Sequence, residues 1–135
     1  MPMLSDDEFL HAFHTCTLEA AQFDHHAHVR IAWILARRCP LPDAIEQVCV
    51  GIQCLATHFG APEKFNRTMT EALVRWIAHG ARADCDFEAF AATHPQLFTD
   101  VRGLLARHYS PERLTSLEAK RMFVVPDREP LPHVD

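Results

Sequence analysis

The sequence predicts an all-α fold, a compact single-domain bundle of about four main helices followed by short C-terminal helices and an extended tail. Apolar residues recur at three- and four-residue spacing along most of the chain. Only four glycines occur in 135 residues, and strand-like alternation of apolar and polar residues is hard to find. A chain of this length can bury one ordinary core, so we expect residues 1–135 to form one domain, with 124–135 as the tail.

The first two helices have clear N-terminal signals. Ser5 followed three residues later by Glu8 forms a capping box, which predicts a first helix ending near Thr15. Asp24 is a good N-cap residue for a second helix over about 25–38. Because this second helix is apolar nearly all round, we expect it to be the central and most buried one.

Two further long helices follow. The third is predicted over about 42–59, with Pro42 at its first position and Gly60 beyond its end. The chain restarts at 61–64, and a fourth helix continues through Phe65 to about residue 78. Together these segments supply the apolar faces of the bundle.

The last third of the chain predicts shorter helices. One begins after caps within 84–86 and is broken by His94-Pro95, and another covers about 100–107. Ser110-Pro111 is typical of a cap with proline at the first helical position, and one more short helix is expected over 116–122.

Charge and composition disfavour several classes of partner. The formal net charge of -5 gives no general attraction to phosphate backbones or anionic lipid, so we expect neither nucleic-acid nor membrane binding. The first residues lack the features of a signal peptide, which favours a cytoplasmic protein. Five cysteines without a C-x-x-C pair indicate reduced core residues and no disulfide framework.

A dense polar cluster stands at the start of the second helix, in a chain with ten histidines. His25 and His28 lie three residues apart and share one helix face, whereas His26 points elsewhere. The helix N-terminus disfavours imidazolium, and neutral imidazole is the form that binds a metal. The pair therefore suggests a divalent transition metal, such as zinc, iron, nickel or copper.

Two ligands are insufficient, so a third must come from another helix. The candidates that the sequence leaves open are Asn66, Glu71, His58, His79, His94 and His108. The structural alternative is that His25 and His28 cap their helix and hydrogen-bond to neighbouring loops, including the C-terminal segment.

Five short pieces of the chain carry a resemblance when they are taken together. They are Phe23-x-His25-x-x-His28-x-Arg30-x-Ala32-Trp33, Gly60-Ala61-Pro62-x-Lys64-Phe65 with Thr68-x-Thr70, Phe87 to Leu97 with His94-Pro95, Tyr109-Ser110-Pro111-Glu112-Arg113-Leu114, and Val125-Pro126-Asp127 with Pro130-Leu131-Pro132. The chain resembles a family of small uncharacterised bacterial all-α proteins. The resemblance implies a compact helical domain whose special polar residues belong to the first two pieces. It also implies that relatives often carry histidine where this chain has Asn66.

Three further residues are candidates for handling a substrate. Arg30 can clamp a substrate carboxylate, or it can form a buried ion pair with an acid such as Glu71 or Asp127. Thr70 can line a pocket, or it can cap the fourth helix. Tyr109 can donate a proton, or it can belong to a turn.

The function predicted from the sequence is a small cytoplasmic metal-binding protein, an enzyme that acts on a small organic substrate. A metal bound there would polarise a carbonyl or activate water or dioxygen, which leaves hydrolase, lyase and oxygenase chemistry open. The alternative is a non-catalytic helical module that binds a protein partner or forms a homo-oligomer, with structural histidines.

Overall fold

The computed structural model describes residues 4–81 and 86–132, and every regular element in these ranges is a helix, which confirms the all-α prediction. The α-helices are α1 (Asp6–His14), α2 (His25–Arg38), α3 (Leu41–His58), α4 (Arg67–Ala81), α5 (Phe87–Thr93), α6 (Gln96–Thr99), α7 (Val101–Ala106), α8 (Pro111–Leu114) and α9 (Leu117–Arg121). Two single 3-10 turns, η1 (Ala20–Gln22) and η2 (Pro62–Lys64), precede α2 and α4. Among these helices, none combines the length and apolar character needed to cross a membrane.

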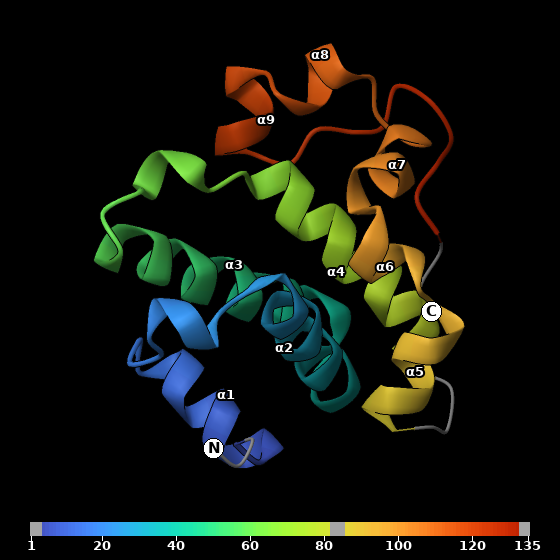
Figure 1. The fold of residues 1–135 in the computed structure, drawn as a ribbon. Coiled ribbons are helices and arrows are strands. Elements are labelled where there is room, and N and C mark those ends of the chain that lie inside the picture. The colour runs from blue at the N-terminus through green and yellow to red at the C-terminus, as the bar shows by residue number, and fades with distance from the viewer. Residues whose placement is uncertain (1–3, 82–85, 133–135) are drawn as a thin grey trace.

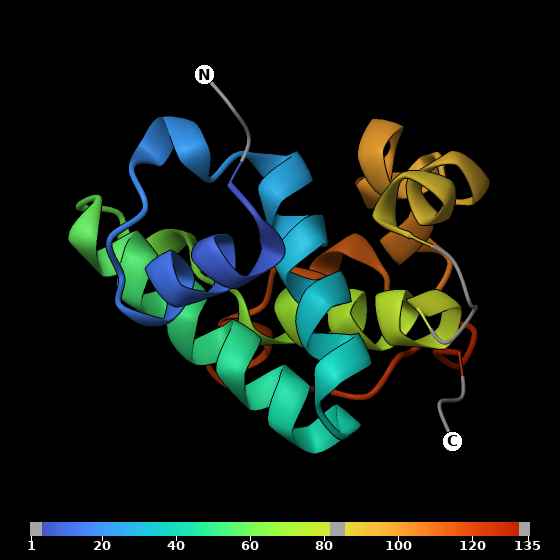
Figure 2. The same cartoon turned by 90° about the horizontal axis from the view of Figure 1, so that it is seen from below.

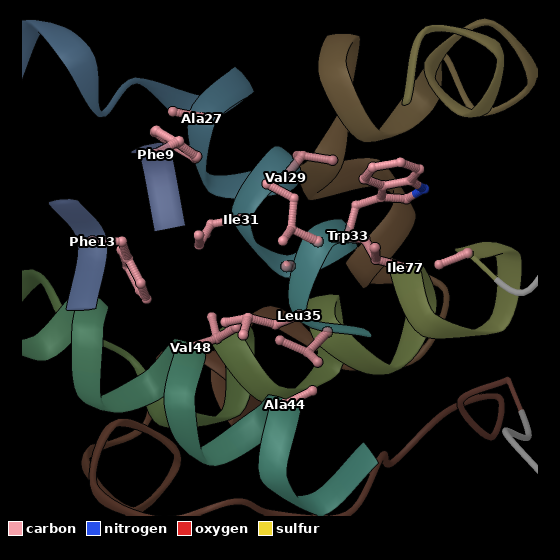
Figure 3. Close-up of a cluster of buried hydrophobic side chains, with 14 of the residues drawn as sticks. Phe9, Phe13, Ala27, Val29, Ile31, Trp33, Leu35, Ala44, Val48 and Ile77 are labelled. Carbon is pink, nitrogen blue, oxygen red and sulfur yellow. The ribbon is translucent and has the colours of Figure 1, made fainter. Parts of the chain in front are cut away.

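Helix α2 is the centre of the bundle, as the sequence predicts. It packs against α1, α3, α4 and α6, and Figure 1 shows it nearly end-on between these neighbours. Figure 2, turned by 90°, shows its length with α1 beside it. The main core gathers around it, with Val29 and Leu35 of α2, Val48 of α3 and Ile77 of α4 among the buried side chains (Figure 3).

Helix α1 is fixed to the bundle through a buried arginine of α2. The Arg30 guanidinium donates hydrogen bonds to the Leu4 carbonyl oxygen at 2.8 Å and to the Asp6 carboxylate at 2.9 Å. It also lies over the Phe9 ring, 4.6 Å from the centroid. A salt bridge from Arg38 to Asp7 adds a second, exposed contact between α1 and α2.

A second buried cluster joins α4 to the C-terminal segment. It consists of Ala72, Leu105, Tyr109, Leu114, Ala119 and Val124. Residues 122–132, which follow α9, are non-helical, as predicted for the tail, and hydrogen bonds join them to the helices before them. The Thr68 hydroxyl of α4, for example, donates to the Met122 carbonyl oxygen and accepts from the Val124 N–H group.

Several helix boundaries differ from the predictions. Helix α3 begins at Leu41, so Pro42 lies one position inside the helix start. The segment predicted to restart a continuous fourth helix forms η2, and α4 itself starts only after Asn66. The sequence did not indicate α6. Of the caps predicted within 84–86, Asp86 caps α5, while residues 84 and 85 lie outside the described residues.

Candidate functional site

A small pocket of about 150 Å³ lies where α2, α3, η2 and α4 meet. Most of its wall is aliphatic, which suits the body of an organic molecule. Its lining residues are His28, Val29, Ala32, Val48, Ile52, Lys64, Phe65, Asn66, Met69, Thr70, Leu73, Val74 and Ile77. Four of these carry polar side chains that can orient a ligand: His28, Lys64, Asn66 and Thr70.

A second pocket, of about 300 Å³, adjoins the first on the side of η2. It adds Phe23, Leu55, Ala56, Phe59 and Ala61 to the set of lining residues. The two pockets share His28, Ile52, Lys64 and Phe65, so these four side chains stand at their junction. In the described part of the chain, Lys64 is the one charged residue that lines either pocket, and no acidic residue does.

His28 is the residue of the predicted histidine pair that reaches the pockets. Its Nδ1 lies 2.8 Å from the Asp24 carbonyl oxygen, and because a carbonyl only accepts, the neutral ring donates from Nδ1. Nε2 then keeps its lone pair. The ring packs on Phe23 with centroids 4.1 Å apart. Burial lowers the pKa of His28, and the nearby His25 adds to this, while the bond to Asp24 opposes it.

We predict that His28 makes the stability of the fold depend on pH. Since its pKa is lower in the folded protein than the usual 6.5, the unfolded chain binds the proton more readily. The free energy of unfolding should therefore fall as the pH drops through and below about 6.5. Urea unfolding between pH 5 and 8 would measure this, since histidine changes charge in that range.

The variant His28→Asn should flatten this dependence, because it removes the titrating ring. The exposed His11 of α1 offers a matched control, and His11→Asn should keep the wild-type slope. Equal slopes for wild type and His28→Asn would contradict the prediction.

His25 points to a different neighbour. Its Nε2 lies 2.7 Å from the Leu97 carbonyl oxygen, and the ring centroid is 6.4 Å from that of His28. Two imidazoles on one tetrahedral metal, with metal–nitrogen distances of about 2.1 Å, have centroids about 5 Å apart. A metal held by both rings would require them to approach each other. His26 points elsewhere, as predicted: its side chain is exposed, and its ring lies against Phe87 and Phe98.

Asn66 and Thr70 line the pocket, but their polar atoms have partners within the fold. The Asn66 Oδ1 accepts the Met69 N–H group at 3.0 Å, and its Nδ2 donates to the Leu114 carbonyl oxygen at 2.9 Å. Asn66 is therefore the N-cap of α4 and a bridge to α8. The Thr70 hydroxyl donates to the Asn66 carbonyl oxygen at 2.9 Å. As a metal ligand, Asn66 would have to give up its cap.

The remaining candidates for a third metal ligand line neither pocket. They are Glu71, His58, His79, His94 and His108. Glu71 is buried between two guanidinium groups, those of Arg67 and Arg75. In His108, Nδ1 donates to the Glu129 carbonyl oxygen and Nε2 accepts from the Trp76 indole. Within 4–81 and 86–132, no group of three or more His, Cys, Asp or Glu side chains is placed to hold a metal ion.

Arg30 and Tyr109, the other two catalytic candidates, do not line either pocket. Arg30 is occupied by Leu4 and Asp6, so it forms the buried ion pair of the second alternative, with Asp6 in place of the examples Glu71 and Asp127. Tyr109 is fully buried, and its hydroxyl donates to the Val124 carbonyl oxygen at 2.7 Å. Burial raises the pKa of Tyr109 to about 12, which makes it a poor proton donor or acceptor near neutral pH.

Lys64 is the polar pocket residue that reasoning from the sequence did not select. It ends η2 and has an exposed side chain at the junction of the two pockets. No side-chain hydrogen bond or ion pair of Lys64 occurs within the described ranges. Its only signal in the sequence was its membership of the Gly60 to Phe65 piece.

Comparison with family models, curated proteins and solved structures finds no match to this chain. The resemblance to a family of small bacterial proteins therefore stays a prediction, and functional arguments rest on the site itself.

Proposed function

We propose that the protein binds a small organic anion with an apolar body in the two adjoining pockets. The observation that carries the proposal is that, among the residues that the structure describes, Lys64 is the one charged lining residue of an otherwise largely apolar site. An apolar concave site with a few convergent polar groups is the usual form of a small-molecule site.

The charge balance of the chain supports an anionic ligand. The protein carries a formal net charge of -5, yet the described pocket walls contain no carboxylate. An ammonium group beside apolar walls donates a charge-assisted hydrogen bond to a ligand that carries a carboxylate. A neutral ligand of the same shape cannot form this bond. Lys64 stands at the junction of the pockets, so the acidic group would lie there and the apolar body along the aliphatic wall.

His28 gives the site a group for chemistry as well as for binding. Its Nδ1 is held by the Asp24 carbonyl oxygen, so the ring orientation and tautomer are fixed. Its lowered pKa keeps the ring neutral near pH 7, with the lone pair on Nε2 available as a proton acceptor. In an enzyme that acts on the bound anion, His28 is the general base that we propose.

Three ligands of one shape and different charge test the proposal. Phenylacetate, phenylethanol and phenylethylamine would be titrated into isotope-labelled protein, with binding followed by NMR shifts. We expect phenylacetate to bind tightest and to shift signals of the shared residues Ile52 and Phe65. Lys64→Met should weaken it about three- to tenfold, as suits a partly exposed charge pair.

The control variant is Lys120→Met, because Lys120 is the other lysine of the chain and lines neither pocket. It should leave phenylacetate binding unchanged. Ile52→Trp, which fills the junction, should abolish binding in a protein whose spectrum stays dispersed. Equal affinity for all three ligands, or unchanged binding to Lys64→Met, would overturn the proposal. Absence of binding by all three ligands would favour the non-catalytic module.

A transition metal at His28 is a second proposal, and one observation favours it. A metal-bound histidine usually donates its other ring nitrogen to a carbonyl or carboxylate, which is the arrangement of His28 with Asp24. Metal analysis of protein purified without a histidine tag would test it, with His25→Ala/His28→Ala as the comparison. Less than about a tenth of an equivalent of any transition metal in the wild type would refute metal binding at this pair, because a resident ligand set holds its metal through purification.

A further inference from the structure

The C-terminal end of α1 lies along one stripe of α3. His14 Nε2 and Gln47 Oε1 are 2.9 Å apart, and a Cβ added at Gly51 would overlap the Phe13 ring. Positions 47, 51 and 54 are spaced by four and three residues, so they share one face of α3. The next position of that stripe is Cys54.

Cys16 lies opposite Cys54, just beyond the end of α1. Its N–H group donates to the Phe13 carbonyl oxygen, and the Thr17 N–H group donates to the Ala12 carbonyl oxygen, so the α1 end forms a Schellman motif. Cys16 adopts the left-handed conformation of that motif, with φ of 59°. The Cys54 thiol is a close enough neighbour of Cys16 in this turn to contribute to the raised pKa of Cys16.

We propose that Cys16 and Cys54 form a site of reversible thiol–disulfide exchange with small-molecule disulfides, closing an internal disulfide between the α1 end and α3. The stripe of contacts at Gln47 and Gly51 supplies the geometry, because it holds the two segments together whether or not the thiols react. Both thiols are free in this structure, Cys54 is exposed and Cys16 is half-buried, so the pair is accessible to a small oxidant.

The exchange proceeds in two steps with oxidised glutathione as the oxidant. The Cys54 thiolate attacks one sulfur of glutathione disulfide, forming a mixed disulfide at Cys54 and releasing one glutathione thiolate. The Cys16 sulfur, after losing its proton to solvent, attacks the Cys54 sulfur of the mixed disulfide and expels the second glutathione as thiolate. Both leaving thiolates pick up protons, so two protein thiols are oxidised and one glutathione disulfide is reduced to two thiols.

Burial and the neighbouring Cys54 thiol together raise the pKa of Cys16 to about 11. The exposed Cys54 is therefore the attacking thiol, and Cys16 resolves the mixed disulfide. The reactivity of Cys54 can be compared with that of Cys39 and Cys49 in the same chain, because both are also free. Burial raises the pKa of the Cys49 thiol to about 11, so Cys49 should react more slowly than Cys54.

The test incubates the folded wild-type chain with oxidised glutathione and maps the products by mass spectrometry after blocking free thiols. We expect a chain lighter by two hydrogen atoms, with Cys16 linked to Cys54, and a reductant should restore the original mass. Cys16→Ser should accumulate the glutathione adduct at Cys54, since the resolving thiol is gone. Cys54→Ser should react at Cys16 at least about tenfold more slowly than Cys54 reacts in the wild type, as a weakly ionised thiol would.

A stable glutathione adduct at Cys54 of the wild type, with no internal link after prolonged incubation, would overturn the proposal. So would a Cys16–Cys54 link that forms only in urea-unfolded protein. A variant that keeps only Cys16 and Cys54 repeats the measurement without competition from the other cysteines, and it must give the same link. The experiment involves no pocket ligand, so its outcome is independent of the proposed anion site.

Discussion

Phe13→Ala should lower the free energy of unfolding by about 3–5 kcal/mol, the range for deleting a buried aromatic ring. The Phe13 side chain has no exposed surface, and its ring packs beside Phe23 with centroids 5.7 Å apart. The ring occupies the space between α1 and α3 that the absence of a side chain at Gly51 leaves open. Urea unfolding followed by circular dichroism would measure the loss.

Gly51→Ala should destabilise the fold by about 1–3 kcal/mol from the opposite side of the same contact, because the added methyl group displaces a ring that has no room to move. Phe13→Leu makes space for that methyl group, so the double variant should be more stable than the sum of the two single losses predicts, by at least about 0.5 kcal/mol.

The neighbouring Val50 is a matched control on α3, because its side chain is 56% exposed. Val50→Ala should change stability by no more than about 0.5 kcal/mol. Strict additivity of Phe13→Leu and Gly51→Ala would show that the two positions are not coupled and would contradict this account of the α1–α3 contact.

Local signals in the sequence were sufficient to predict most of the helices and the central position of α2. Ser5 and Glu8 form the predicted capping box, and Asp24 caps α2 through the Ala27 N–H group. These interactions join residues three apart, so the residue types and their spacing determine them. Helix α2 was identified as the central helix because its residues are apolar nearly all round, which is also a property of the local sequence.

The site depended on contacts between distant segments, which spacing cannot reveal. His25 and His28 do share a helix face, yet one bonds to Leu97 and the other borders the pockets. Lys64 belongs to the site only because η2 packs against α3, next to the pockets that His28 of α2 also lines. Likewise, the acid paired with Arg30 is Asp6 of α1, and no local signal distinguishes Asp6 from the other carboxylates of the chain.

The late pieces of the predicted resemblance have a structural explanation of their own. Ser110 bonds to the Asp127 carboxylate through both its N–H group and its hydroxyl. The Arg113 Nε donates to the Val125 carbonyl oxygen at 2.6 Å. The Tyr109 to Leu114 piece and the Val125 to Asp127 piece therefore hold each other in place. The side chains of Ser110 and Arg113 are used in hydrogen bonds to the C-terminal segment.

Asn66→Ala should lower the free energy of unfolding by about 2–4 kcal/mol, because two interactions are lost together. The cap of α4 at Met69 contributes about 1 kcal/mol, and the buried Leu114 carbonyl oxygen left without its donor costs about 1–3 kcal/mol. Asn66→Ser keeps a capping oxygen but cannot reach Leu114. Its free energy of unfolding should therefore fall less than that of Asn66→Ala, by about the contribution of the cap.

Repeating these unfolding measurements with and without a strong chelator separates the structural role of Asn66 from the predicted metal role. If Asn66 acts through its two hydrogen bonds, the loss in each variant is the same under both conditions. A metal ligand would behave differently, because binding to the folded state adds stability only while metal is present. A loss for Asn66→Ala that disappears on chelation would therefore assign Asn66 to a metal site and refute its assignment as the cap that joins α4 to α8.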